Sequence, residues 1–509
     1  MSQTANRIIK NTGYLYARMG ISLFVSFWTT RLVLNALGAS DYGIFTLVGG
    51  AIAMLGFLNG SMAGATQRFM SYYQGKGEAD RSKELFNISI VLHTVLAFVL
   101  VIALFAVGTI LFHGILVIPK GRDVAAYIIY GSLVISTAFT VMSVPYDATL
   151  NAHENMRFFA VVGILESVLK LVVAFITVYT QMDKLIVYGV LMACIPICIL
   201  TIMRVYCHRH YDECTFDFRN TWNSFMARDV AGFAGWNFFG SSAMVICNHG
   251  LGIVVNMFFG VLLNTALSIA QQISTQLKAL SEGMLKAVNP VITKKAGEGN
   301  PDKMMVFAYS STKLSFFLLA ILVIPFFIET PYVLQIWLKG VPEWAVLFCR
   351  LQLIASILTT ILGESFLTVL KADGNIRKQS LLSSITYMLS ICMTSFLFYL
   401  RLPPWSMYIS IILFNVIAYN LIIIFILKSR GLLEMSFFLN KIILPSIICL
   451  AISLILGYLP LFFVDPSFVR LIMVIIVSTI SFASSFYNIV LSESERIVAG
   501  QIRSFVKWG

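Results

Sequence analysis

The feature that most constrains this chain is an internal repeat, in which two spaced motifs recur about 220 residues further on. Gly75–Arg81 matches Gly297–Lys303 at an offset of 222, with the shared pattern Gly-x-Gly-x-x-Asp followed by Arg or Lys. Leu150–Arg157 matches Leu370–Arg377 at an offset of 220, with the shared pattern Leu-x-Ala-x-x-Asn-x-Arg. Two registers that agree this closely indicate that the second half of the chain repeats the first.

The composition places these repeats in a membrane. Only 12% of the 509 residues are charged, against about a quarter in soluble domains, while 58% are hydrophobic and 40 are Phe. With about 20 apolar residues per crossing, the hydropathy pattern predicts about fourteen transmembrane helices and an all-α fold. We expect them to begin near residues 14, 43, 86, 124, 158, 185, 231, 261, 306, 345, 382, 405, 442 and 469.

The number of spans in each half fixes the kind of repeat. Six spans precede the polar segment 207–228 and six follow it, so both halves cross the membrane in the same direction. Such a parallel repeat is related by an axis along the membrane normal. We therefore predict a six-helix lobe at 1–206, a cytoplasmic linker at 207–228, a second six-helix lobe at 229–428, and a helix pair with a cytoplasmic tail at 429–509.

The distribution of basic residues predicts the orientation. One side of the membrane, which includes both termini, receives 25 of the 36 Lys and Arg residues, and the opposite side receives 8. The richer side is expected to be cytoplasmic. The net charge of +12 then follows from topology, and we predict no nucleic-acid partner, because the basic loops lack interleaved aromatic residues.

Two motifs resemble ligand sites but have simpler explanations. The cluster Cys207, His208, His210 and Cys214 fits no standard zinc spacing, so we interpret it as a solvated connector and predict no metal site. The repeated Gly-x-Gly segments lack the further residues of dinucleotide and P-loop motifs, so we predict no cofactor. We interpret them as helix ends, with Asn300 and its counterpart Asp80 beginning the next helix.

Polar side chains inside the expected spans are the strongest functional signal, because a charge in the bilayer is costly and usually faces a watery cavity. Arg18 lies in the first span. The other positions form stripes on the seventh and eighth spans at helical spacing, and we expect all of them to line one cavity. The stripes contain Trp236, Asn237, Ser241 and Asn248, and then Gln271, Thr275, Lys278, Glu282, Lys286 and Asn289.

Structural explanations remain open for several of these charges. Glu282 has the spacing to neutralise Lys278 and Lys286, and Glu166 has the spacing to neutralise Lys170, for which we favour the structural reading. Arg18 is close enough to the end of its span to reach the headgroups. Lys313 and Glu364 are intramembrane charges without an obvious local partner.

The segment Leu37–Gly43 after the first span, Gln67-Arg68, and Pro145 with Ala152 and Asn155 resemble the polysaccharide biosynthesis proteins of the multidrug/oligosaccharidyl-lipid/polysaccharide exporter (MOP) superfamily. The layout of six, six and two spans agrees with that family. The resemblance is to Wzx-type flippases and implies a MATE-like fold. It also implies a non-enzymatic protein of the bacterial inner membrane that moves undecaprenyl-diphosphate-linked oligosaccharide outward for O-antigen, capsule or exopolysaccharide assembly.

The chemistry of the candidate residues agrees with that implication. We expect Arg18 and Lys278 to bind the diphosphate, with Glu282 beside them. The sugars would contact amide and aromatic side chains, namely Trp236, Asn237, Asn248, Gln271 and Gln272. The expected mechanism is alternating access of the two lobes. The expected partners are the lipid-linked substrate, membrane lipid and other polysaccharide assembly proteins.

Two alternatives accompany this reading. A multidrug antiporter of the same superfamily would carry cations, and bacterial members commonly have an Asp in the first span, where this chain has Arg18. A membrane glycan polymerase or ligase would need a sizeable outer loop with catalytic residues. The longest outer connection predicted here runs only from about Glu329 to Trp344.

Overall fold

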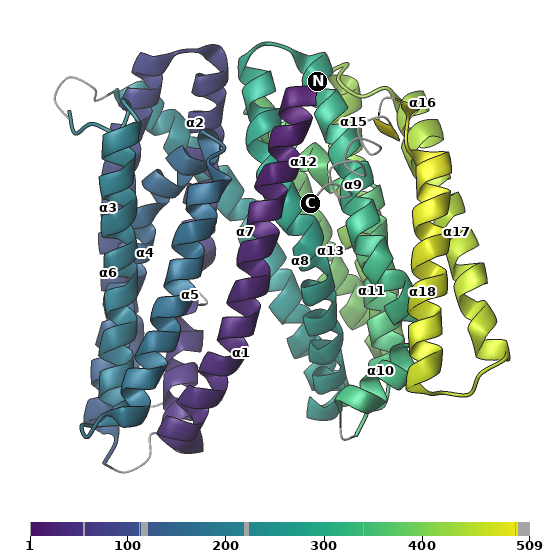
Figure 1. Cartoon of the computed structure of the whole chain (residues 1–509), viewed down its shortest axis with the longest axis horizontal. Coiled ribbons are helices and arrows are strands. Elements are labelled where there is room, and N and C mark those ends of the chain that lie inside the picture. The colour runs from purple at the N-terminus through teal and green to yellow at the C-terminus, as the bar shows by residue number, and fades with distance from the viewer. Residues whose placement is uncertain are drawn as a thin grey trace, which may run out of the picture. The chain divides into compact units, whose positions relative to one another are not determined.

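The structure is a computed structural model that describes residues 2–53, 56–110, 112, 121–217, 223–338, 340–493 and 495–496. All regular elements in these ranges are helical (Figure 1). The chain forms two compact units. The N-terminal unit contains Ile9–Phe238 with Gly297–Gly299, and the C-terminal unit contains Met1–Ile8, Phe239–Ala296 and Asn300–Gly509.

The N-terminal unit is built from long helices joined by short turns. The first, α1, is interrupted at Gly38, whose backbone (φ 75°, ψ 168°) is not helical, so one helical segment ends there and another begins. A positive φ of this kind is open to glycine at no steric cost. The helices are α1 (Ser2–Ala53), α2 (Gly56–Lys76), α3 (Ala79–Ile110), α4 (Asp123–Ala152), α5 (Met156–Tyr179), α6 (Lys184–His210) and the first part of α7 (Ser224–Phe259).

The C-terminal unit continues from the second part of α7. Its helices are α8 (Val261–Gly297), α9 (Pro301–Ile328), α10 (Thr330–Trp337), α11 (Ala345–Ile361), α12 (Glu364–Asp373), α13 (Arg377–Tyr399), α14 (Met407–Ser410), α15 (Tyr419–Ser429), α16 (Met435–Phe438), α17 (Leu444–Tyr458) and α18 (Phe468–Ser485). A π-helical segment, Ile411–Ala418, joins α14 to α15, and another, Leu439–Ile443, joins α16 to α17. Each such group forms one continuous span.

The predicted all-α membrane fold is confirmed. Eleven helical segments in the described ranges are long and apolar enough to cross a membrane, and α11 with α12, bent by 44°, makes up to twelve. The polar helices α2 and α8, of 21 and 37 residues, complete the fourteen long segments that we expected. Helix α8 begins where the eighth span was expected, near residue 261, whereas α2 begins at Gly56, later than the start expected near residue 43. The structure divides into two compact units, with a boundary inside α7 after Phe238, and not into four parts. The predicted four-part domain division therefore stays a prediction.

The repeated motifs form equivalent turns in the two halves. Gly77 and Gly299, which match in the first motif, both have left-handed backbones, with φ of 73° and 67°. Glu154 and Gly374, which match in the second motif, are also left-handed, with φ of 56° and 92°. The first repeat therefore tolerates a strained Glu where the second has a Gly, because the turn itself is the same.

The capping interpretation of the first motif is confirmed in one half. Asn300 caps α9, its side chain accepting a hydrogen bond from the Lys303 amide at 3.0 Å, and Pro301 occupies the first helical position. Asp80 is different, because α3 already begins at Ala79 and Asp80 lies in its first turn. Gly297 also allows a close approach to the end of α2. A Cβ added at Gly297 would overlap the Tyr72 carbonyl oxygen and lie 3.2 Å from the α-carbon of Gly75.

The C-terminal helix pair is packed on α9. One hydrophobic cluster joins Phe316 and Ile324 of α9 to Cys449 of α17 and to Val474 and Phe482 of α18. The ring centroids of Phe316 and Phe482 are 5.6 Å apart in an edge-on arrangement. Burial of this apolar surface holds the pair to the C-terminal unit.

An ionic clasp joins three connections of the N-terminal unit. Arg122, just before α4, donates to Asp41 from Nε (2.8 Å to Oδ1) and from Nη2, and to Asp183 from Nη1. Asp41 follows the Gly38 break, and Asp183 caps α6 by accepting from the Leu185 amide at 3.0 Å. Burial raises the pKa of Asp183, but the Arg122 guanidinium and the helix amides lower it more, so the pKa lies below its ordinary value.

Substitution Arg122→Gln tests the clasp. We expect it to lower the free energy of unfolding by about 1–3 kcal/mol at neutral pH, because charge-assisted hydrogen bonds of two carboxylates are lost. A carboxylate with a lowered pKa stabilises the fold above its ordinary pKa of about 4 and stops doing so as the pH falls through the lowered value. Thermal unfolding in detergent should therefore show a smaller difference between variant and wild type in acid.

Lys184→Gln is the matched control, since Lys184 adjoins Asp183 but forms no ion pair within the described residues. An equal loss of stability in both variants would contradict the clasp.

Candidate functional site

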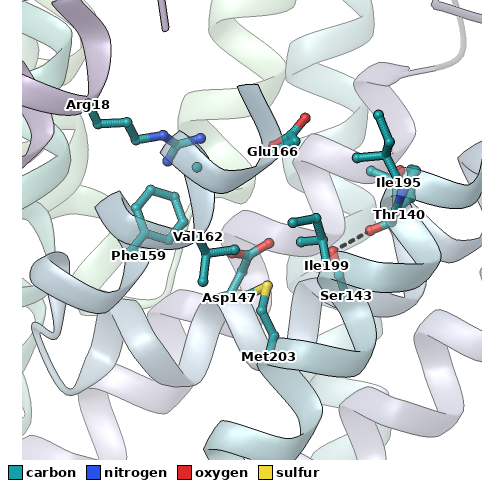
Figure 2. Close-up of a pocket in the computed structure, with 12 residues that line it drawn as sticks. Arg18, Thr140, Ser143, Asp147, Phe159, Val162, Glu166, Ile195, Ile199 and Met203 are labelled. Carbon is teal, nitrogen blue, oxygen red and sulfur yellow. Dashed lines mark hydrogen bonds between the residues drawn. The ribbon is translucent and has the colours of Figure 1, made fainter. Parts of the chain in front are cut away.

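A pocket inside the N-terminal unit brings a charged residue of the first span together with three later helices (Figure 2). It contains about 620 Å³ of empty space, counting its open mouth. Its floor and walls are largely apolar. The lining residues are Arg18 from α1, Thr140, Ser143 and Asp147 from α4, Phe159, Val162, Gly163 and Glu166 from α5, and Ile195, Pro196, Ile199 and Met203 from α6.

The Arg18 side chain crosses from α1 over the surface of α5. Its guanidinium carbon lies 4.5 Å from the centroid of the Phe159 ring, within range of a cation–π interaction. Gly163 lies directly under the guanidinium, and a Cβ added there would overlap Arg18 Nε and Cζ. Figure 2 shows the guanidinium extending toward the pocket above the Phe159 ring.

Contacts on both sides of Arg18 fix α1 against the unit. Asn11 donates from Nδ2 to the Glu154 carbonyl oxygen at 3.1 Å. One helical turn beyond Arg18, the hydroxyls of Ser22 and Ser167 are hydrogen-bonded at 2.8 Å. Since α1 is held to the α4–α5 turn before Arg18 and to α5 after it, the position of the Arg18 backbone is fixed relative to the pocket.

Arg18 carries a charge that the described residues do not neutralise by an ion pair. Glu166, which lines the same pocket, is paired with Lys170 at 2.6 Å. The structural reading of Glu166 and Lys170 is thereby confirmed, although Glu166 also faces the pocket. Asp147 is the second lining carboxylate, and it was not predicted from the sequence. The pocket thus combines one guanidinium with two carboxylates.

Trp236 and Asn237 belong to the N-terminal unit but do not line this pocket. Asn237 donates from Nδ2 to the Ser61 carbonyl oxygen of α2 at 3.2 Å, and the same nitrogen would lie 3.4 Å from a Cβ on Gly64. Asn237 therefore helps to join α7 to α2. Any contact of these two residues with a substrate remains a prediction.

The predicted stripe on α8 lies in the C-terminal unit. Gln271, Gln272 and Glu282 are exposed, and Lys278 is half-buried. Lys278 forms no ion pair within the described residues, so the alternative of a Lys278–Glu282 salt bridge is not made, although the charges of Lys278 and Glu364 both act on Glu282. Asn248 on α7 is also exposed.

Two hydrogen bonds join α8 to neighbouring helices of the C-terminal unit. Ser274 is hydrogen-bonded to Ser356 of α11 at 2.7 Å, and Asn289 accepts from Thr368 of α12 at 2.9 Å. Asn289 was predicted on the functional stripe, so part of that stripe serves helix packing.

Lys313 has a partner that the local sequence does not reveal. Its Nζ lies 2.9 Å from Glu495 Oε2, and Ser310 donates to Glu495 Oε1 at 3.0 Å. The partner lies 182 residues away, beyond α18. Burial raises the pKa of Glu495, but the Ser492 amide and the Lys313 charge lower it more, so its pKa lies below the ordinary value.

The interpretation of a solvated connector holds only in part for residues 207–217, because Arg209, His210, Asp212 and Thr215 are exposed while other side chains are packed. Cys207 and Cys214 are completely buried. His153 pairs with Glu213 and stacks on Tyr211 with a centroid distance of 4.1 Å. Burial raises the pKa of Glu213, but His153 lowers it more, so its pKa is below the ordinary value. Residues 218–222 of the predicted linker lie outside the described residues, as do 497–509 of the predicted tail.

Among the described residues, no group of three or more His, Cys, Asp or Glu side chains is arranged to hold a metal ion. The polar atoms at the pocket are an Arg, two carboxylates and the hydroxyls of Thr140 and Ser143. Ser143 donates to the Thr140 carbonyl oxygen at 2.8 Å. The arrangement offers recognition by charge and hydrogen bonding.

The fold is that of the MATE transporters of the MOP superfamily. A MATE transporter in the bent conformation has a TM-score of 0.71 and 16% identity, covering 84% of this chain and 95% of its own. An outward-facing multidrug resistance MATE transporter gives 0.72 and 15% identity over 84% and 96%. A MOP superfamily transporter from Pyrococcus furiosus, described by the reverse polarity of its binding pocket, gives 0.69 and 16% identity over 85% and 97%. No family model and no curated protein sequence matches the chain.

Substitution Glu495→Gln tests the ion pair of Lys313. We expect the free energy of unfolding to fall by about 3–5 kcal/mol, because the buried Lys313 charge would lose its counter-charge. The double variant Lys313→Met with Glu495→Gln should recover most of that loss, since no charge remains buried. Chemical or thermal unfolding in detergent measures both.

Glu493→Gln, two residues away at an exposed position, serves as control. If the double variant were no more stable than Glu495→Gln alone, the ion pair would not be the source of the effect.

Proposed function

We propose that the protein is a flippase that translocates undecaprenyl-diphosphate-linked oligosaccharide across the bacterial inner membrane for O-antigen, capsule or exopolysaccharide assembly. The observation that carries the proposal is Arg18, a guanidinium without an ion pair in the described structure, at an internal pocket of a MATE-type fold. A cation held in a membrane-spanning helix without a counter-charge is suited to an anion that arrives and leaves.

A diphosphate is the anion whose chemistry fits best. Guanidinium groups donate pairs of parallel hydrogen bonds to phosphate oxygens, and these bonds are stronger than neutral ones. The apolar walls formed by Val162, Ile195 and Ile199 lower the local dielectric and strengthen the attraction. In the C-terminal unit, Lys278 offers a second cation without an ion pair among the described residues.

The oligosaccharide part of the substrate requires amides and hydroxyls. Gln271 and Gln272 of α8 are exposed, as is Asn248 of α7, and Glu282 lies beside Lys278 on the same stripe. We place Trp236 and Asn237 in the same role on the N-terminal unit. The Pyrococcus furiosus transporter, whose pocket polarity is described as reversed, is a precedent for changing charge on this fold.

The mechanism we propose is alternating access, in which the two units carry the head group between the leaflets without covalent chemistry. A membrane potential that is negative inside would assist outward movement of an anion by about 2.3 kcal/mol per charge per 100 mV. Both termini would be cytoplasmic. Other polysaccharide assembly proteins would supply or receive the glycolipid.

A cation or multidrug antiporter is the second candidate, and one observation favours it. Asp147 and Glu166 place two carboxylates at the pocket, and carboxylates are what a cationic substrate requires. Arg18 opposes this reading, because it would repel a cation from the same space. A polymerase or ligase has less support, since Glu329 in the longest predicted outer connection is buried against Arg470 at 2.7 Å.

Substitutions of the two cations test the flippase. We expect Arg18→Ala and Lys278→Ala each to reduce leaflet exchange of lipid-linked oligosaccharide roughly ten- to a hundredfold, the worth of about 1.5–3 kcal/mol for a charged hydrogen bond. The measurement is exchange in reconstituted vesicles, supported by surface polysaccharide display in cells. Protein levels are matched by immunoblot.

Lys10→Ala is the control, because Lys10 is an exposed basic residue two turns earlier on α1. Unchanged exchange in the Arg18→Ala, Lys278→Ala double variant would reject a transport role for these cations. Export of cationic drugs by the wild type, abolished by Asp147→Asn, would favour the antiporter instead.

A further inference from the structure

We propose that Gly163 is a positioning residue, which leaves a notch on α5 through which the Arg18 guanidinium reaches the pocket. The inference rests on the proposed function, because it concerns how the anion site is set. Gly163 has no side chain, and no charge or motif in the sequence indicates a role for it.

The Arg18 side chain takes a path over α5. Arg18 belongs to α1, and the pocket is bounded by α4, α5 and α6, so its side chain must cross the surface of α5 to reach the pocket. It crosses at Gly163, where an added Cβ would overlap Nε and Cζ and would lie 2.7 Å from Cδ. Any residue other than glycine would fill the space that the guanidinium now occupies.

The backbone at position 163 does not require a glycine. Gly163 lies in the interior of α5, well past its start at Met156. Its φ is not positive, so its backbone conformation suits any residue. Glycine in a helix interior is less favourable than alanine. The absence of a Cβ therefore serves packing, and the atoms packed there are those of Arg18.

Contacts one helical turn before and one turn after Gly163 hold the Arg18 guanidinium once it has crossed α5. The Phe159 ring lies beneath it at 4.5 Å, one helical turn before Gly163, and Phe159 is nearly buried. One turn after Gly163, Ser167 donates to the Gly163 carbonyl oxygen at 3.0 Å and is hydrogen-bonded to Ser22 of α1. The notch is thus bounded by a ring on one side and by an α1–α5 contact on the other.

A side chain at position 163 would disturb another side chain and not the helix backbones. The overlap at Gly163 is with the outer part of a flexible side chain and not with backbone. An alanine would therefore displace the arginine while the helices stay in place. Gly163→Ala should leave the protein folded but remove the guanidinium from the Phe159 face and from the pocket.

The experiment measures binding of inorganic pyrophosphate to the purified full-length protein by ligand-induced thermal stabilisation, in a double-mutant cycle. We expect Gly163→Ala to weaken pyrophosphate binding about tenfold and Arg18→Ala to weaken it at least as much. In the Arg18→Ala background, Gly163→Ala should have no further effect, because the residue it positions is gone. Without pyrophosphate, the midpoint temperature of thermal unfolding of Gly163→Ala should equal that of the wild type or lie slightly above it.

Gly131→Ala is the matched control, a glycine of the neighbouring helix α4 with nothing within 4 Å of its added Cβ. It should bind pyrophosphate as the wild type does. The inference would be overturned if Gly163→Ala bound pyrophosphate with wild-type affinity or if the wild type did not bind it. It would also be overturned if Gly163→Ala lowered the affinity equally in the wild-type and Arg18→Ala backgrounds.

Leaflet exchange of lipid-linked oligosaccharide is measured separately on the same five proteins. Absence of exchange in the wild type would defeat the proposed function, while the pyrophosphate cycle would still decide the role of Gly163. Exchange that falls in Gly163→Ala to the level of Arg18→Ala, with Gly131→Ala unaffected, would support both.

Discussion

The cost of placing a guanidinium in a membrane-spanning helix organises the N-terminal unit. Estimates for that cost range from about 2.5 to 17 kcal/mol, so the surroundings of Arg18 must offset it without neutralising it permanently. An aromatic face, a notch in the facing helix and a polar pocket achieve this, and the nearby Glu166 is paired with Lys170. The carboxylates remain close enough to modulate the potential of the pocket but form no ion pair with Arg18 in the described structure.

Much of the fold was predictable from the sequence because hydropathy and the repeat depend on local chemistry. A span needs a run of apolar residues, and a left-handed turn needs a glycine or a residue that tolerates strain. The matched turns at Gly77 and Gly299 follow from the motif itself. Helices α2 and α8 overlap two further expected spans, but neither is among the helices apolar enough to cross a membrane by composition, so their crossing stays a prediction.

The site was predictable only in part, because long-range partners leave no local pattern. Arg18 was found as a charge within a span, but Asp147 and Gly163 reach the same pocket from helices more than a hundred residues away. Lys313 showed no local partner because Glu495 lies beyond several further spans of the chain. An Asp two residues after a proline within an apolar span was a signal for Asp147. For Gly163 there was none, since the residue matters for the atoms it lacks.

The ionic clasp at Arg122 also bears on how the N-terminal unit can change over evolution or by design. Its three members come from three separate connections, at Asp41, Arg122 and Asp183. Surface loops usually accept insertions and exchanges independently of one another. Here the three connections depend on one another through their ion pairs. Replacing any one of them with the equivalent segment of a related protein would leave a charged side chain without its partner, so the three must be exchanged together.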